Sequence, residues 1–108
     1  SGVWRDTNSD GDFDVFLWAK NSGATTVVAP ESADLFLGPE GAWERIPYQA
    51  EAAGNYPYWT YTLPGTDRWE PAGTMAITVH YAASQAPGRW LAKLVTDNGT
   101  VAEFTFGL

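Results

Sequence analysis

The strongest constraint on the fold is the alternation of apolar and polar residues in short segments that are separated by turn residues. The segment TMAITVHY, residues 74–81, puts four apolar side chains on one face of an extended chain: Met75, Ile77, Val79 and Tyr81. A period of two is typical of a strand that buries one face. Because no apolar pattern with a helical period persists for three turns, the sequence predicts strands throughout.

Other segments fit the same interpretation. WLAKLVT and TVAEFTF flank an Asn-Gly turn and predict a hairpin over residues 89–106. PYWTYTL alternates as well, DVFLWAK is apolar on both faces as in a central strand, and ADLFLG and AWERIPY predict two shorter strands. A single helical turn is expected at 49–54. The predicted fold is an all-β, immunoglobulin-like β-sandwich of seven to eight mostly antiparallel strands.

Composition limits the number of domains, the kinds of metal site and the classes of partner. The 108 residues suit one domain, expected to span residues 1–108, and 44% hydrophobic content is too high for a disordered segment. The chain has no cysteine, which excludes disulfides and thiolate metal sites. Its net charge of −7 argues against nucleic acid and anionic lipid as partners, since an acidic surface repels phosphate.

An aspartate-rich stretch near the N-terminus has the spacing of a calcium loop. Its oxygen-bearing side chains match positions 1, 3, 5, 7 and 9 of an EF-hand loop, with Gly11 at position 6, and they are Asp6, Asn8, Asp10, Asp12 and Asp14. Position 12, normally a glutamate, is Leu17. The alternative is a solvated turn in which the side chains bond to nearby backbone amides. Calcium is therefore a candidate ligand that would clamp the N-terminal segment, and no cofactor is required.

Catalytic signals are weak. The only histidine, His80, lies on a predicted strand, and no nucleophile motif of the G-x-S-x-G type occurs. One histidine without cysteine is too few ligands for a zinc site. The sequence therefore predicts a protein without enzymatic activity.

Aromatic residues make up 15% of the chain, with six tryptophans. About half of these rings are expected in the core, because a sandwich without disulfides depends on large side chains for burial. The others would stack on sugars or anchor a protein interface.

Five segments in order carry a resemblance. They are a Lys-Asn-x-Gly strand end at 20–23, an Asp-x-Phe-x-Gly-Pro-Glu-Gly turn at 34–41, a Tyr-Trp-x-Tyr strand at 58–61, a Trp-x-Pro-x-x-Thr segment at 69–74 and the Asn-Gly hairpin. Together they resemble the soluble domains of the FlaF/FlaG family of archaellum (archaeal flagellum) stator proteins, and the G-type members most. The aspartate loop is not part of that pattern.

The resemblance implies a β-sandwich anchored by an N-terminal membrane helix that is absent from these 108 residues. The domain would face outward, between the cytoplasmic membrane of an archaeon and its surface layer. There it would act as a structural part of the motor, associating with itself and with a FlaF-type protein that holds the surface-layer protein. The family has no known enzymatic activity.

The C-terminal hairpin is the predicted contact region. It ends in EFTFGL with no charge after Glu103, which leaves an unguarded edge unless something pairs with it. The candidate interface residues are Leu94, Val95, Val101, Phe104 and Phe106, each of which has the alternative of being a core residue.

The main alternative function is a secreted or cell-surface carbohydrate-binding module with a calcium-stapled N-terminal loop. An exposed coplanar row of Trp and Tyr rings would favour it. Rings that are buried or held in a protein contact would count against it.

Overall fold

A computed structural model describes residues 2–7, 13–21, 25–63, 65, 68–83, 85, 87–97, 99 and 101–107, with the backbone alone for residues 2–7, 101 and 104. The elements of this part of the chain, in order, are β1 (Gly2–Thr7), β2 (Phe13–Lys20), the 3-10 helix η1 (Pro30–Ser32), β3 (Asp34–Pro39), β4 (Glu44–Ile46), α1 (Gln49–Ala52), β5 (Tyr58–Thr62), β6 (Thr74–Tyr81), β7 (Arg89–Val95) and β8 (Val101–Gly107). None of the helices described here has the length and apolar character needed to cross a membrane.

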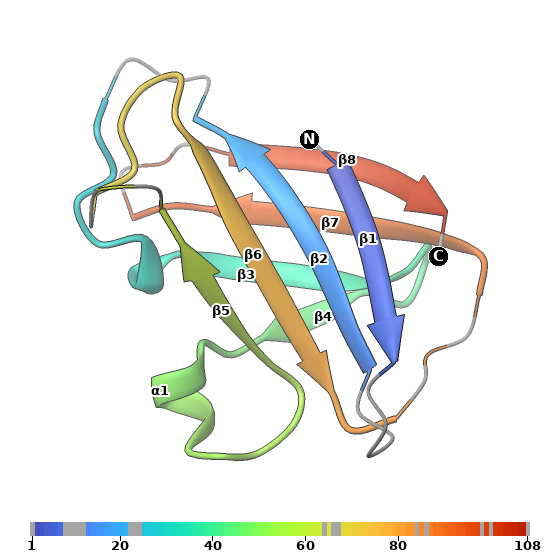
Figure 1. Cartoon of the computed structure of the whole chain (residues 1–108). Helices are drawn as coiled ribbons and strands as arrows, with labels where there is room; N and C mark the ends of the chain where they lie inside the picture. Colours follow the sequence, from blue (N-terminus) through green and yellow to red (C-terminus); the bar gives the residue numbers. More distant parts are fainter. Residues whose placement is uncertain are drawn as a thin grey trace.

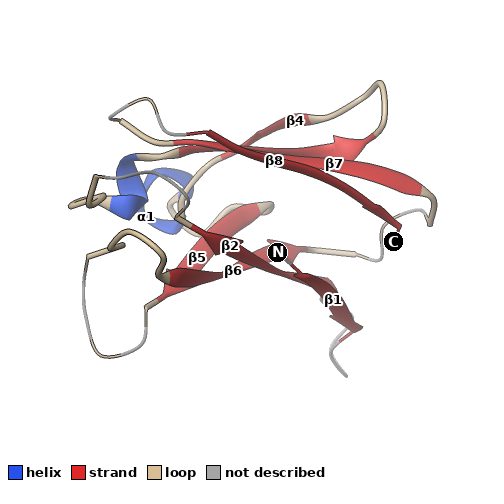
Figure 2. Cartoon of the chain, turned by 90° about the horizontal axis from the view of Figure 1, so that it is seen from above, coloured by secondary structure: helices blue, strands red, loops and turns tan. Residues whose placement is uncertain are grey.

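The eight strands form two four-stranded sheets that lie face to face. The front sheet has the order β1-β2-β6-β5 and the back sheet the order β4-β3-β7-β8, as Figures 1 and 2 show. Every pairing within the sheets is antiparallel. The predicted all-β sandwich of seven to eight antiparallel strands is confirmed. The strand orders of the front and back sheets correspond to strands A-B-E-D and C′-C-F-G of an immunoglobulin-type sandwich.

The core lies between the sheets and is built from the alternating residues of the predicted strands. In β6 the apolar residues Met75, Ile77, Val79 and Tyr81 are all buried, while the intervening residues are exposed or half-buried. The predicted hairpin over 89–106 is present as β7 and β8, and the single turn predicted at 49–54 is α1. The period of two therefore identified the inward face correctly.

Strand β2 is central in the front sheet, between β1 and β6, as its apolar character on both faces predicted. In a two-layer sandwich, however, only one face of a strand can be covered by the opposite sheet. The inner residues Val15 and Leu17 are buried, whereas Phe16 is half-buried and Trp18 is 37% exposed. The second apolar face of β2 thus lies on the surface.

The sequence did not predict β1. Its six residues pair with β2 from Gly2 opposite Trp18 to Thr7 opposite Phe13, so Asp6 lies in a strand instead of a loop. The segment is short and its aspartate is rare in strands, which is why propensity did not reveal it. Pairing with β2 supplies the missing stabilisation.

A buried asparagine joins the end of β2 to the start of β6. The side chain of Asn21 is fully buried, and its amide donates hydrogen bonds to the carbonyls of Thr25 (3.0 Å) and Trp69 (3.1 Å). The backbone of Asn21 also donates to the Gly73 carbonyl and accepts from the Ala72 amide. Because a buried amide is costly unless it is satisfied, this network fixes one geometry for the two chain segments.

Replacement of Asn21 by alanine should destabilise the domain by about 1–3 kcal/mol, because the side-chain hydrogen bonds to the Thr25 and Trp69 carbonyls are lost. The measurement is urea unfolding followed by tryptophan fluorescence. Asn55→Ala is the matched control: Asn55 is exposed, and its amide bonds only locally to the Ala52 carbonyl. Equal costs at the two positions would contradict the role given to Asn21.

Candidate interaction site at the sandwich edge

The β4 and β5 side of the sandwich is closed. Although both are edge strands, the chain after β4 continues along β5: the Trp59 amide donates to the Pro47 carbonyl (3.0 Å), and Tyr48 pairs with Trp59 as a parallel bridge. Helix α1 follows and lies beside β5 (Figure 1). Covering an edge with a helix or loop prevents it from pairing with another chain.

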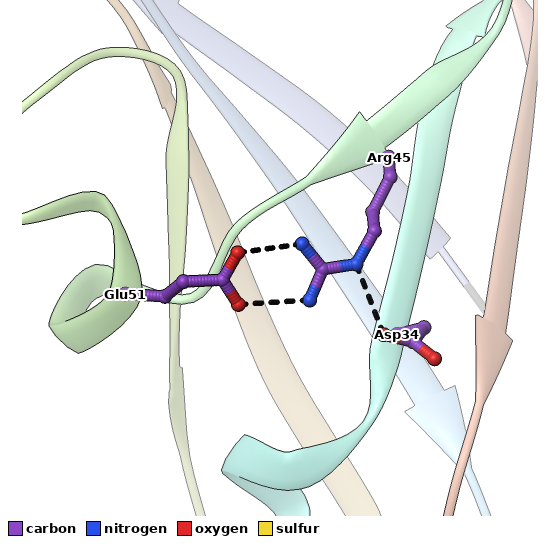
Figure 3. Close-up of polar contacts among 3 residues, drawn as sticks. All are labelled: Asp34, Arg45 and Glu51. Atoms are coloured by element: carbon purple, nitrogen blue, oxygen red, sulfur yellow. Dashed lines mark hydrogen bonds and ion pairs between the residues drawn. The ribbon is translucent and has the colours of Figure 1, made fainter.

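An arginine holds α1 in this place (Figure 3). On β4, the Arg45 Nε donates to Asp34 Oδ1 (3.0 Å), while its two terminal nitrogens donate to the Glu51 carboxylate of α1 (2.7 and 2.9 Å). These hydrogen bonds raise the pKa of Arg45 and lower the pKa of Glu51. All three side chains are about half exposed, so the network orients the helix more than it stabilises the fold.

The β8 edge differs from the closed side. This strand is the last of the back sheet, has seven residues without proline, and carries one charge, Glu103. Natural edges are usually shortened, charged, interrupted by proline or covered. In the part of the chain that the structure describes, β8 shows only the single charge. It is therefore better suited to pair with a partner strand than the closed β4 and β5 edges.

A hollow of about 380 Å³ lies at the end of this hairpin, and its lining consists of Gly88, Arg89, Thr105, Phe106 and Gly107. Its two glycines face open space, since a β-carbon on either would meet nothing within 4 Å. The half-buried Phe106 packs on the core, and Arg89 contacts Glu40 at 3.3 Å. An aromatic floor beside an arginine is a composition enriched in protein-binding hot spots.

The five predicted interface residues lie in different environments. Leu94 is 3% exposed and belongs to the core, whereas Val95 is half-buried and points to the outer face of the back sheet. Phe106 packs against the core and also lines the hollow. Val101 and Phe104 lie on β8 opposite Val95 and Ala92, but their side chains are outside the described part of the chain.

Sequence reasoning missed Arg89, Thr105 and the two glycines of the hollow. The positive φ of Gly88, 139°, is a property of the backbone that the sequence does not display. A signal was available for Val95. It lies two residues after Lys93, so both side chains point to the same face of the strand, and a lysine indicates the outward face.

The predicted calcium ligands are only partly described. Asp6 and Asp14 lie opposite each other in the β1–β2 pairing, whereas Asn8, Asp10 and Asp12 lie outside the described residues. The described residues alone form no cluster of three or more metal-binding side chains. Calcium binding by this loop stays a prediction.

Asp14 has another contact that the sequence did not indicate. Its Oδ1 lies 3.1 Å from His80 Nδ1, and His80 Nε2 lies 3.1 Å from the Thr60 hydroxyl. With a neutral imidazole, Nδ1–H donates to Asp14 and the hydroxyl donates to Nε2. The order acid, imidazole, hydroxyl is that of a hydrolytic triad.

These three residues come from three adjacent strands and project from the outer face of the front sheet, where Tyr58 stacks on the imidazole at 4.6 Å. Catalysis by such a group needs a pocket that places a substrate against the hydroxyl, together with donors for the developing oxyanion. The contacts with Asp14 and Thr60 and the Tyr58 stack fix the orientation of the histidine ring on this face.

The exposed aromatic rings that the structure describes do not form a row. Among the described residues, Trp18 lies on the outer face of the front sheet, Trp43 packs edge-on to Phe36 on the back sheet, and Tyr56 lies in the loop before β5. Trp59, Trp69 and Trp90 are buried. This arrangement counts against a carbohydrate-binding platform.

The fold is similar to that of solved structures. The archaellum periplasmic stator protein FlaG from Sulfolobus acidocaldarius matches with a TM-score of 0.71 and 22% sequence identity, over 95% of this chain and 93% of that chain. The archaellum periplasmic stator protein complex of FlaF and FlaG from the same organism matches with a TM-score of 0.70 and 22% identity, over 95% and 84%. No protein-family model and no curated protein matches the chain. The resemblance predicted from the sequence motifs is confirmed at the level of the fold.

The Arg45–Glu51 contact predicts a pH dependence. Since the pKa of Glu51 is lowered from 4.5 in the folded chain, the contact stabilises the fold above that pH, and the contribution is lost as the pH falls through the folded-state value. Glu51→Gln should lower the melting temperature slightly at neutral pH and have no effect in acid. Thermal unfolding across this range is the measurement, with the exposed Glu70→Gln as control. A difference that persists unchanged in acid would contradict the assignment.

The calcium prediction is tested by calorimetric titration of chelator-treated protein. We expect one Ca²⁺ per chain and at least ~tenfold weaker binding after Asp10→Ala. Asp10 is preferable to Asp14, whose loss would also free His80. Asp97→Ala is the control because this exposed aspartate belongs to another turn. If calcium produces no heat and no change in melting temperature, the loop is only a turn.

Proposed function

We propose that this chain is a structural, non-enzymatic component of the archaellum motor, a stator element that lies outside the cytoplasmic membrane of an archaeon. The observation that carries the proposal is the match to FlaG over nearly the whole of both chains. The five sequence motifs, found in the order expected for that family, support it independently. In the full-length protein an N-terminal helix would anchor the domain.

A stator part transmits force through rigid contacts and needs no chemistry. The domain suits this task because its core is continuous between two sheets and contains three buried tryptophans. One side is closed by α1 and the Arg45 network, which leaves the β8 side for assembly. The function therefore depends on which surfaces make contacts.

The partner at the β8 side is a FlaF-type domain, which would connect this chain indirectly to the surface-layer protein. The proposal is supported by the solved complex of FlaF with FlaG. A strand of the partner would extend the back sheet along β8, while an apolar side chain would fill the hollow against Phe106 beside Arg89. Self-association of this chain is the second contact that we propose.

The β8 contact is tested by two lysine substitutions at the hairpin, Val95→Lys and Thr105→Lys. Each should weaken binding of the soluble FlaF-type domain from the same organism at least ~tenfold, because a charge is placed in the contact. Isothermal titration calorimetry gives the affinity. The matched controls are Val28→Lys, in the exposed loop before η1, and Gln49→Lys, at an exposed position of α1 on the closed side.

Controls that bind like wild type, together with weakened hairpin variants, would place the contact at β8. Equal affinity of all four variants would remove the hairpin from the interface. If the wild-type domain does not bind any FlaF-type domain, the stator function itself is contradicted.

A further inference from the structure

The outer face of the front sheet is a surface that the proposed β8 contact does not use. Its described side chains are Asp14, Phe16, Trp18 and Lys20 of β2, Thr74, Ala76, Thr78 and His80 of β6, and Tyr58, Thr60 and Thr62 of β5. We refer to this set as the front face. It lies toward the viewer in Figure 1.

The front face is nearly uncharged. Among its described side chains only Asp14 and Lys20 carry formal charge, and they lie at opposite ends of β2. The outer face of the back sheet, in contrast, carries five charged residues: Asp34, Arg45, Arg89, Lys93 and Glu103. In the β1–β2 pairing Asp6 is the partner of Asp14, so the acidic positions gather at one end of this sheet and Lys20 lies at the other.

The centre of this face is apolar. Trp18 is 37% exposed, its neighbours Phe16 and Ala76 are half-buried, and Ala76 is directly opposite Trp18 in the β2–β6 pairing. An exposed tryptophan surrounded by small or uncharged side chains is the arrangement of an interface anchor. Toward one end, the Asp14–His80–Thr60 hydrogen bonds and the Tyr58 stack hold the polar groups in fixed positions.

We propose that the front face packs against the front face of a second copy of this chain, with the two β2 strands antiparallel across a two-fold axis. The inference rests on the proposed function, since it assigns the surface for the self-association named there. The axis would pass near Leu17, so that the Trp18 side chains of both copies meet at the centre. Asp14 of each copy would then lie over Lys20 of the other, about 20 Å from the symmetry-related pair.

Charge favours a second copy over other occupants. Two copies with −7 each repel one another, and the described side chains of the front face carry two formal charges where those of the back sheet carry five. The antiparallel arrangement adds two opposite-charge pairs, whereas a parallel one would place acid over acid. A basic partner would be drawn to the acidic surfaces elsewhere, and nucleic acid or anionic lipid would be repelled.

The area is sufficient for a reversible dimer. Four strands spaced about 4.8 Å apart and about 16–26 Å long cover on the order of 400 Å² per copy, compared with about 800 Å² in a standard interface. A contact of this size is expected to dissociate at low concentration. Membrane-anchored copies held side by side would strengthen it through a high effective concentration.

The test is sedimentation equilibrium of the soluble domain over a range of concentrations. We expect wild type to change from one chain to two, a twofold rise in mass, and Trp18→Lys to remain a monomer. Trp43→Lys is the matched control, because Trp43 is similarly exposed, 41%, but lies on the back sheet. This control should dimerise like wild type. Unfolding midpoints of both variants establish that they are folded.

The orientation of the two copies is tested separately. Lys20→Glu should weaken dimerisation about tenfold because it places acid over acid, whereas Lys20→Arg, which keeps the positive charge, should dimerise like wild type. Equal affinity of Lys20→Glu and wild type would overturn the antiparallel arrangement. A wild-type domain that is monomeric at every concentration, or a Trp18→Lys variant that still dimerises, would overturn the interface.

The same variants distinguish this inference from the proposed function. Trp18→Lys should bind a FlaF-type domain as tightly as wild type, because the β8 hairpin is on the other sheet. Loss of self-association with intact FlaF-type binding supports both proposals. Loss of FlaF-type binding in Trp18→Lys would show that the front face serves the other partner and would overturn the assignment to a second copy.

Discussion

The hydrogen bonds of one buried amide, that of Asn21, set the arrangement on which the rest of the domain depends. They hold the end of β2 against the segment that leads into β6, and these two strands form the middle of the front sheet. Trp69 takes part through its carbonyl, and its own indole nitrogen donates to the Gly73 carbonyl while the ring fills the core. In a chain without cysteine, this satisfied polar network provides the fixed point that a disulfide supplies in many immunoglobulin-type domains.

The two sides of the sandwich differ in how their edge strands are covered. On one side, Tyr48 and α1 close the β5 edge, and Arg45 ties the helix to β3 and β4. On the other side β8 ends its sheet with a glycine-bounded hollow and little charge. The outer faces differ as well, since five charged residues lie on the back sheet and two among the described side chains of the front sheet. A domain with two distinct contact surfaces can join two different neighbours, which a load-bearing assembly requires.

Much of the fold could be predicted because the signals were local. Period-two alternation gave the inward face of β6, and the Asn-Gly turn gave the hairpin. The motifs also have physical reasons: a β-carbon on Gly38 would lie 2.6 Å from the Trp43 backbone, so that turn requires glycine. The site was less predictable because it depends on neighbours distant in sequence. Nothing local indicates that Asp14, His80 and Thr60 meet across three strands, and alternation alone did not separate the core residue Leu94 from the outward Val95.

The central claim is that this domain assembles through its β8 edge while its closed edge stays free. Hydrogen–deuterium exchange of backbone amides, measured with and without a FlaF-type domain, tests it most directly, because pairing with a partner strand protects edge amides that are otherwise open to solvent. The account predicts new protection along residues 101–107 and unchanged exchange in residues 49–62. Protection confined to α1 and β5, or none in β8, would contradict it.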